Sequence, residues 1–163
     1  EVLGRFALRK LDKHDPDKIA VAISATVKRC RTLGYLDDDA FALSQARSQR
    51  RQGRSQRSIR QRLRQHKLDD TIISAALDVA DQHEANSELL AACVFARRRR
   101  LGPFYRRQCD NVNDREVVIQ RQLGSMARAG FGMAISNKVI RLENMNAAEM
   151  LISQLEQGED PTI

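Results

Sequence analysis

The sequence lacks several features that would identify a common functional class. It has no tryptophan, and aromatic residues make up only 4% of its 163 residues. No uncharged apolar run approaches the roughly 18 residues that a membrane-spanning helix requires, and the first residues lack the pattern of a secretion signal. Because 42% of the residues are hydrophobic and 30% are charged, we expect a chain that folds in water and does not associate with membranes.

Cysteine and histidine are few, and their spacing indicates neither a metal site nor a disulfide framework. The three cysteines form no C-x-x-C pair, and the three histidines lack the i, i+4 pairing of helical metal ligands. A glycine-rich phosphate loop and a nucleophile elbow are also missing. We predict reduced thiols in a cytoplasmic protein, no cofactor and no enzymatic activity. The residues concerned are Cys30, Cys93, Cys109, His14, His66 and His83.

Acidic residues are absent from two long stretches that are rich in arginine. Residues 40–68 contain eight arginines and Lys67 without any Asp or Glu, and residues 89–109 contain six more arginines, again without an acid. The whole chain carries a net charge of +7, so the remainder of the chain is net acidic. Cationic segments of this kind are attracted to polyanions or to an acidic protein surface.

The arginines of the first stretch recur at helical spacing. Four occur at i, i+3, i+4 and i+7, and three more at i, i+3 and i+7, so each set shares one helix face. Seven guanidiniums on two faces repel one another unless an anion is near, and we predict that they form a binding surface with the second basic stretch. Arginine rather than lysine favours bidentate contact with phosphate or carboxylate, so DNA and an acidic protein patch both remain possible partners. The predicted surface consists of Arg47, Arg50, Arg51, Arg54, Arg57, Arg60, Arg64, Lys67, Arg97, Arg98, Arg99, Arg100, Arg106 and Arg107.

Apolar residues recur at helical spacing along nearly the whole chain, and no alternating strand pattern is present. The spacing predicts a first helix that begins at Asp15-Pro16 and ends before Gly34. Residues 145–155 could extend the preceding helix or form another. The sequence therefore predicts an all-α fold, with further helices over about residues 37–53, 55–67, 70–80, 87–101, 114–126 and 131–142.

Two motifs admit both a chemical and a structural interpretation. The aspartates at residues 37–39 could suggest metal or acid–base chemistry, but no partner residue is suitably spaced, and negative charge suits a helix N-terminus. We therefore predict that they begin a helix. Phe104 and Tyr105, beside Arg106 and Arg107, could stack on a base or fold back onto the helices. The sequence leaves these two possibilities open.

An internal repeat connects these helices. The run from Ala46-Arg47 to Gly53 resembles the run from Ala96-Arg97 to Gly102, and three apolar positions recur with the same spacing. Units this short cannot bury a full apolar face alone, so we predict tandem three-helix, helix-turn-helix-like repeats in an elongated chain. Their expected ranges are 1–36 for an incomplete first repeat, 37–81 for the second, 87–142 for the third, and 143–163 for a C-terminal extension, partly helical and then frayed. The arginines at positions 47–64 should be mostly exposed, and Ile59, Leu63, Ile72, Leu77, Met126, Phe131 and Ile135 should be buried.

The string GYLDDDAFA at residues 34–42, followed by an arginine-rich helix, a glycine and an I-x-x-x-L pattern, resembles the RecX family. ARRRRLGP at residues 96–103 and ARAGF at residues 127–131 resemble the family's last repeat, and the resemblance covers roughly residues 19–140. One position departs from the family pattern, because Lys67 stands where a glycine or small residue is usual.

This resemblance implies a regulator of the RecA recombinase in DNA recombination and repair. Members of the RecX family are built from tandem three-helix repeats and bind in the helical groove of the RecA–DNA filament. Most of them inhibit the ATPase, co-protease and strand-exchange activities of RecA. For this chain we accordingly expect the RecA filament and single- and double-stranded DNA as partners, and a monomeric state.

Two other functions fit a basic chain of three-helix units. One is a helix-turn-helix repressor, although arginines spread over several helices do not form the single mixed reading helix of such proteins. The other is a nonspecific nucleoid-type or RNA-binding protein. Binding to bare DNA, compared at matched salt with binding to RecA-coated DNA, separates these alternatives from a filament regulator.

Overall fold

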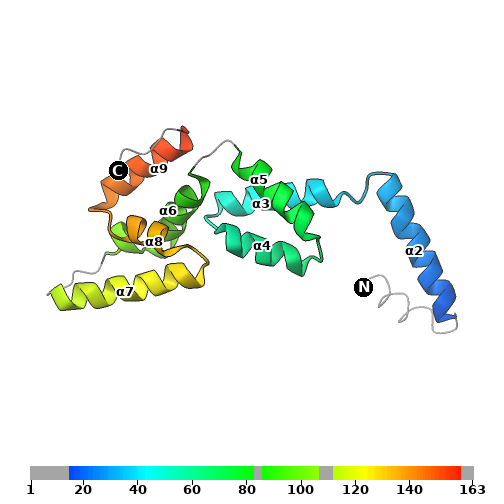
Figure 1. Ribbon diagram of the computed structural model, residues 1–163, viewed down its shortest axis with the longest axis horizontal. Coiled ribbons are helices and arrows are strands. Elements are labelled where there is room, and N and C mark those ends of the chain that lie inside the picture. Colours follow the sequence, from blue (N-terminus) through cyan, green and yellow to red (C-terminus); the bar gives the residue numbers. More distant parts are fainter. Residues whose placement is uncertain (1–14, 83–85, 107–111, 159–163) are drawn as a thin grey trace. The chain divides into compact units, whose positions relative to one another are not determined.

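The computed structural model describes residues 15–82, 86–106 and 112–158, with only the backbone of Val112 and Asn113. Within these ranges the chain forms eight α-helices and one short 3₁₀ helix, and no strand (Figure 1). The all-α fold predicted from the apolar spacing is therefore confirmed. The chain divides into two compact units, Glu1–Asp38 and Asp39–Ile163.

Among the described residues of the first unit, helix α2 spans Pro16–Thr32. The Asp15 side chain caps it by accepting a hydrogen bond from the Asp17 amide at 3.0 Å, and Pro16 is the first helical residue. Gly34 follows the helix with φ 72°, a left-handed conformation that glycine adopts without steric cost. The predicted start and end of this helix are both confirmed.

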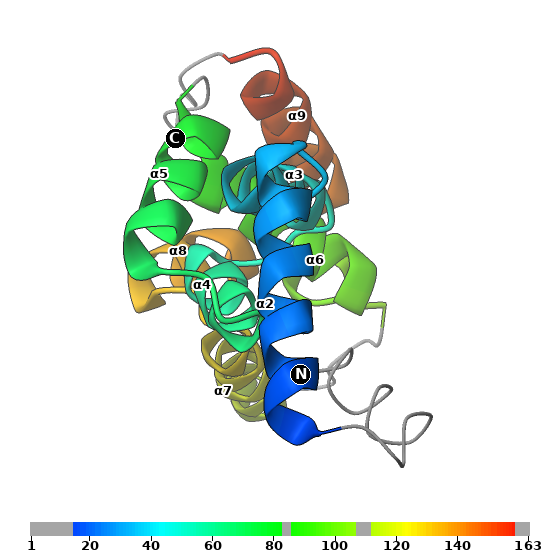
Figure 2. The same ribbon diagram turned by 90° about the vertical axis from the view of Figure 1, so that its right-hand side faces the viewer.

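The second repeat consists of α3 (Asp38–Arg51), α4 (Gln56–Gln65) and α5 (Asp70–Asp81). Helix α4 lies against α5, as Figures 1 and 2 show. Ser55 caps α4 through a hydrogen bond from the Ser58 amide at 3.2 Å. The only apolar side chains of α4, Ile59 and Leu63, are entirely buried. The small core of this repeat consists of Ala46, Ile59, Leu63, Ile73 and Leu77.

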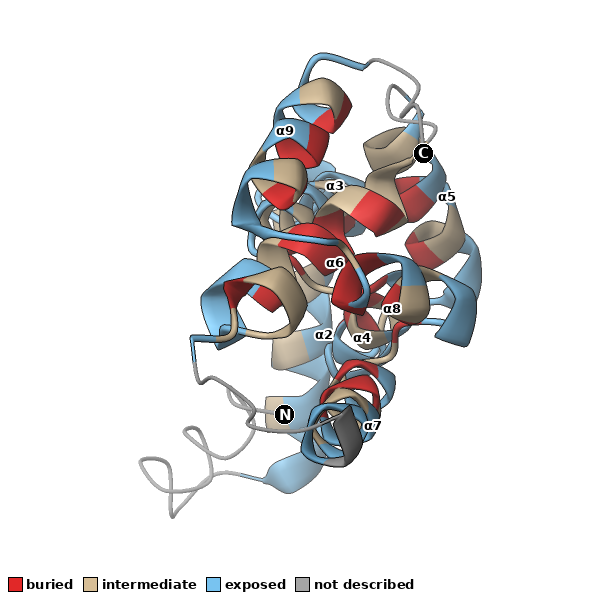
Figure 3. Ribbon diagram, turned by 90° about the vertical axis from the view of Figure 1, so that its left-hand side faces the viewer, coloured by how far each residue is buried: buried red, intermediate tan, exposed pale blue. Residues whose placement is uncertain are grey.

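The third repeat consists of α6 (Ser87–Arg99), the 3₁₀ helix η1 (Gly102–Phe104), α7 (Val112–Arg128) and α8 (Met133–Ile140). Helix α8 packs against both α6 and α7, and α9 (Met145–Glu156) packs against α6 and η1. The segment that the sequence left open is therefore a separate helix, and its residues Leu151, Ile152 and Leu155 join the core of the repeat. Figure 3 shows the buried residues gathered on α6, α8 and α9.

Several positions of the second and third repeats have matching features. Leu63 and Met126 are both entirely buried. Gly53 and Gly102 both have positive φ values, 73° and 54°. The turn after the middle helix has φ 60° at Lys67 in the second repeat and φ 93° at Gly130 in the third. Lys67, the residue that departs from the family pattern, therefore has a left-handed backbone conformation.

Some details differ from the sequence-based expectations. The helix predicted from residue 114 begins at Val112, and the one predicted over residues 131–142 spans Met133–Ile140. Ile72 and Ile135 are half-buried rather than buried, since Ile73 and Ser136 take the inward positions beside them. The elongated arrangement stays a prediction.

Candidate binding surface

Most arginines of the first basic stretch lie on the surface of the second repeat. Arg47, Arg51 and Arg57 are exposed. Within the described part of the chain, none of the three forms an ion pair with a carboxylate. Four of the five guanidiniums on α4 and its cap region, including Arg54 and Arg60, likewise lack a carboxylate partner there. The predicted cationic face is therefore present, but Arg54 and Arg60 are half-buried rather than mostly exposed, and Arg50 differs more.

The expectation that Arg50 is exposed is wrong. Its guanidinium is only 10% exposed and binds Asp81 in bidentate fashion, with Nε–Oδ1 and Nη2–Oδ2 distances of 3.0 and 2.6 Å. It also donates to Glu88 at the start of α6 and to the Arg54 carbonyl. Burial lowers the pKa of Arg50, but the hydrogen bonds to Asp81 and Glu88 outweigh it, so the pKa lies above its ordinary value. Arg50 thus joins the second repeat to the third.

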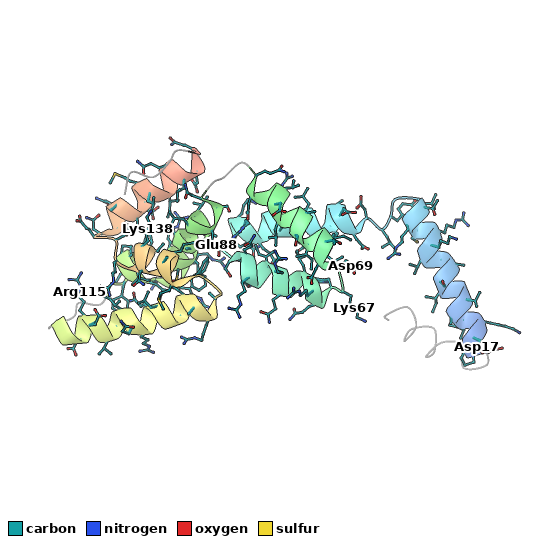
Figure 4. The ribbon with its side chains drawn as sticks, viewed as in Figure 1. Asp17, Lys67, Asp69, Glu88, Arg115 and Lys138 are labelled. Carbon is teal, nitrogen blue, oxygen red and sulfur yellow. The ribbon has the colours of Figure 1, made fainter. Side chains whose placement is uncertain are left out.

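Two further residues of the first stretch have structural roles as well. Arg64 forms an exposed ion pair with Asp70, with an Nε–Oδ1 distance of 2.8 Å, and its hydrogen bond lowers the pKa of Asp70. Such exposed pairs contribute little to stability. Arg60 donates to the Ser74 hydroxyl at 2.9 Å. Lys67 lies exposed in the turn between α4 and α5 (Figure 4).

The second basic stretch ends α6 and begins the following segment. Arg97, Arg98, Arg99 and Arg100 are all exposed. Arg97 pairs with Glu149 of α9 at 3.0 Å, and Arg98 donates to the Gln52 carbonyl at 2.5 Å. Arg100 adopts the left-handed conformation that ends α6, with φ 55°. The segment after α6 was predicted to contribute two more arginines. Arg106 is exposed, and Arg107 lies outside the described residues. Phe104, which precedes them, is buried in the core of the third repeat.

The two basic stretches meet where the α3–α4 turn packs against the third repeat. A Cβ atom added to Gly53 would lie 2.7 Å from the Phe95 backbone nitrogen, and one added to Gly130 would lie 2.6 Å from Ser55 Oγ. Ser55 is entirely buried and donates to the Ala129 carbonyl at 2.6 Å, while it also caps α4. Figure 4 shows Glu88 at this junction. The backbone is tightly packed at Gly53 and Gly130, so the segments that carry the basic side chains of both repeats are fixed relative to each other.

Sequence reasoning missed the partners at this junction. Asp81 and Glu88 lie outside both basic stretches, 31 and 38 residues from Arg50 in the sequence, so the arginine spacing carried no sign of them. Arg128, the last residue of α7, was also missed; it lines a hollow together with Arg54 and Arg99. A basic residue in the last turn of a helix is common, so its spacing alone carried no signal.

The described residues show little that resembles catalytic chemistry. No group of three His, Cys, Asp or Glu side chains within them is arranged to hold a metal ion. Cys93 is entirely buried, and burial raises the pKa of its thiol to about 12, so the reactive thiolate is suppressed. Cys109, His14 and His83 lie outside the described residues. What the surface can do chemically is bind anions through guanidinium groups.

Comparison with known proteins agrees with this description. A family model for the second three-helix domain of RecX matches residues 37–77, which span α3, α4 and most of α5. No solved structure matches the chain. None of the helices within the described ranges combines the length and the apolar character needed to cross a membrane.

Curated relatives extend the match over most of the chain. The regulatory protein RecX of Myxococcus xanthus is 35% identical over 144 residues, which cover 85% of this chain and 74% of the relative. The protein of the same name from Agrobacterium fabrum is 28% identical over 93% of this chain and 76% of its own length. That of Mycolicibacterium smegmatis is 28% identical over 82% of this chain and 67% of its own length. With these repeats, this fold and these relatives, the chain belongs to the RecX family of regulatory proteins.

Proposed function

We propose that this protein regulates the RecA recombinase by binding the RecA–DNA filament, and that it inhibits the ATPase, co-protease and strand-exchange activities of RecA. Its family membership supports a regulatory role, and its relatives are named regulatory proteins rather than enzymes. The protein then acts as a monomeric binding protein in the cytoplasm, where RecA meets chromosomal DNA.

The observation that carries the proposal is the exposure of arginines along both repeats. Arg47, Arg51 and Arg57 of the second repeat and Arg99 and Arg100 of the third are exposed, and none pairs with a carboxylate in the described part of the chain. Cations that the fold leaves unneutralised favour an external polyanion. The filament groove offers DNA phosphates and acidic side chains, and arginine binds both in bidentate fashion.

A RecA ATPase assay on single-stranded DNA tests this function. The purified chain is titrated into RecA at constant salt, and hydrolysis should fall when the chain is well below one molecule per RecA protomer, because a filament transmits a local block to neighbouring protomers. Inhibition that required a stoichiometric excess, and tracked competition for bare DNA, would mean that the chain is a nonspecific DNA-binding protein instead.

A charge-reversal variant tests the surface itself. Replacing Arg47, Arg51 and Arg57 by Glu changes the charge by six units and touches neither core. The matched control replaces Arg29, Arg115 and Arg121, which are exposed and outside both basic stretches, by Glu. The first variant should require about tenfold more protein for half-inhibition than the control, because three cations of the binding surface become carboxylates that repel the DNA phosphates. Equal inhibition by both variants would exclude this surface from filament binding.

A further inference from the structure

A hollow of about 320 Å³ lies at the junction of the second and third repeats. It is formed where the α3–α4 turn packs against the end of α6 and the end of α7. The side chains that matter to its chemistry are Arg54, Ser58, Phe95, Arg99, Ser125 and Arg128. These residues come from four separate segments of the chain, so only the fold brings them together.

Three arginines line this hollow, and no acidic residue does. Arg54 follows the α3–α4 turn, Arg99 is the last residue of α6, and Arg128 is the last residue of α7. No carboxylate lines the hollow, and within the described residues none of the three forms an ion pair. The helix dipole favours arginine at the ends of α6 and α7, but it does not explain why the two helix ends and the turn surround one concavity. Their mutual repulsion is relieved when an anion occupies the hollow.

Polar and aromatic groups accompany these charges. Ser58 and Ser125 also line the hollow, and each hydroxyl is an additional hydrogen-bond donor. The Phe95 ring is half-buried, with its centroid 5.4 Å from that of Phe131, and the Arg99 guanidinium lies 5.9 Å from the Phe95 centroid. Arginines beside an aromatic ring are the usual elements of single-stranded nucleic-acid sites.

The walls of the hollow are held in place by contacts already described. Gly53 fits against the α6 backbone with no room for a side chain, and Ser55 donates to Ala129 at the end of α7. Arg98 of α6 donates to the Gln52 carbonyl in the α3–α4 turn, which ties these two walls together. Groups on such fixed walls lose little entropy when they bind a ligand.

We propose that this hollow binds a backbone phosphate of single-stranded DNA, with Arg54, Arg99 and Arg128 as its ligands and Phe95 beside the adjoining base. This inference deepens the proposed function, on which it rests, by naming the nucleic-acid contact. A carboxylate is satisfied by one bidentate arginine, whereas a DNA strand brings a tetrahedral phosphate at every nucleotide and a base that can stack. Three guanidiniums, two hydroxyls and a ring suit the strand better than an acidic side chain.

Binding of a fluorescein-labelled oligothymidylate to the full chain, measured by anisotropy without RecA, tests the site. The variant replaces Arg54, Arg99 and Arg128 by Gln, and the control replaces Arg29, Arg115 and Arg121, all exposed and outside both the hollow and the two basic stretches, by Gln. Both lose three charges. The hollow variant should bind about tenfold more weakly than the control at 0.15 M salt, and its log–log salt slope should fall by about 0.7, the amount expected for one lost single-strand phosphate contact.

A second pair of variants guards against misfolding. Ser58→Asp places a carboxylate in the hollow at the start of α4, where the helix favours negative charge. Ser153→Asp adds the same charge on an exposed position of α9. Ser58→Asp should weaken oligothymidylate binding several-fold with an unchanged melting temperature, and Ser153→Asp should not.

Three outcomes would overturn the proposal. One is equal binding by the hollow and control triples, and another is equal binding by the two aspartate variants. The third is displacement of the oligonucleotide by millimolar inorganic phosphate at constant ionic strength, because the hollow would then be a site for free phosphate. A parallel RecA ATPase assay separates the two hypotheses: wild-type inhibition with equal oligonucleotide binding by both triples leaves the regulatory function standing and removes only the hollow.

Discussion

The second and third repeats share a helical plan but differ in what holds them together. In the second repeat the core is a cluster of five residues, and α4 contributes only Ile59 and Leu63 to it. In the third repeat the core extends through η1 and α9, including Phe104, Leu151 and Leu155. Equivalent positions such as Leu63 and Met126 are therefore embedded in cores of unequal size.

This difference shows how a binding surface competes with stability. Most of α4 is arginine, glutamine and serine, so the helix has few apolar side chains to bury. The second repeat offsets its small core through contacts with the third repeat, which Arg50, Gly53 and Ser55 make. An arginine-rich helix with only two apolar side chains is thus supported by a neighbouring repeat that has a larger apolar core.

Removing an equivalent core side chain from each repeat should produce the largest effects. Leu63→Ala should lower the free energy of unfolding by about 3 kcal/mol, within the range of buried leucine truncations. Hydrogen exchange should show that α4 and α5 lose protection while α6, α8 and α9 keep theirs. Met126→Ala should reduce protection in both repeats, because the second depends on the third. A uniform loss in both variants would mean that the two repeats unfold as one unit and that the comparison fails.

Breaking the ion-pair cluster should have the next largest effect. Arg50→Gln leaves Asp81 and Glu88 without their cation, at side chains that are 20% and 27% exposed. We expect a loss of about 2 kcal/mol, less than for a fully buried pair because solvent partly screens the charges. Arg51→Gln, one residue further along and exposed, should change urea unfolding by less than about 0.5 kcal/mol. Similar losses in both variants would show that Arg50 contributes only general charge.

High pH should weaken the third repeat through its buried thiol. The pKa of Cys93 is raised to about 12 in the folded chain, so this group's stabilisation is complete below the unfolded pKa near 9 and is lost as the pH rises toward 12. The slope should be about 1.4 kcal/mol per pH unit in that interval. In Cys93→Ala the slope of unfolding free energy between pH 9 and 10 should be shallower by that amount. If the unfolding free energy of the wild-type chain and of Cys93→Ala fell equally with pH, the Cys93 thiol would not be the group responsible.

The smallest expected effect is a gain in the second repeat. Lys67 has φ 60°, where Gly130 stands in the third repeat. A residue with a Cβ atom costs about 1–2 kcal/mol in this conformation, and glycine removes that cost. Part of the benefit is lost because glycine gives up more backbone entropy on folding. Lys67→Gly should therefore raise the free energy of unfolding by about 0.5–1 kcal/mol, measured by urea denaturation. Lys67→Ala keeps the Cβ atom and should bring no gain; if it did, the charge of Lys67 rather than its backbone would be responsible.

Local signals in the sequence predicted the helices and the repeat well. Asp15-Pro16 marks the start of α2, and the matched glycines at 53 and 102 share positive φ values. These features depend on neighbouring residues, whose spacing can be read directly. The docking of α9 onto α6 could not be predicted in this way, because an amphipathic pattern says which face is buried but not against what.

The candidate surface was predicted only in part, for the same reason. Spacing placed Arg47 and Arg51 on one exposed face, and the structure agrees. Spacing also placed Arg50 there, but two acids more than 30 residues away bind it. Likewise, Arg128 reaches the hollow of Arg54 and Arg99 through the packing of whole repeats. Partners that are distant in sequence require the three-dimensional arrangement.

The fit of Gly53 against α6 has a consequence for how this protein can change over evolutionary time. A Cβ atom at this position would meet backbone at 2.7 Å, and no side-chain rotation relieves such a clash. A cationic face, by contrast, is a collective property, and one arginine more or less changes it by a fraction. In a library of random variants we therefore expect Gly53 to be nearly irreplaceable and the exposed Arg47, Arg51 and Arg57 to be interchangeable. Selection would then preserve the contact between the repeats more strictly than any one of these exposed charges.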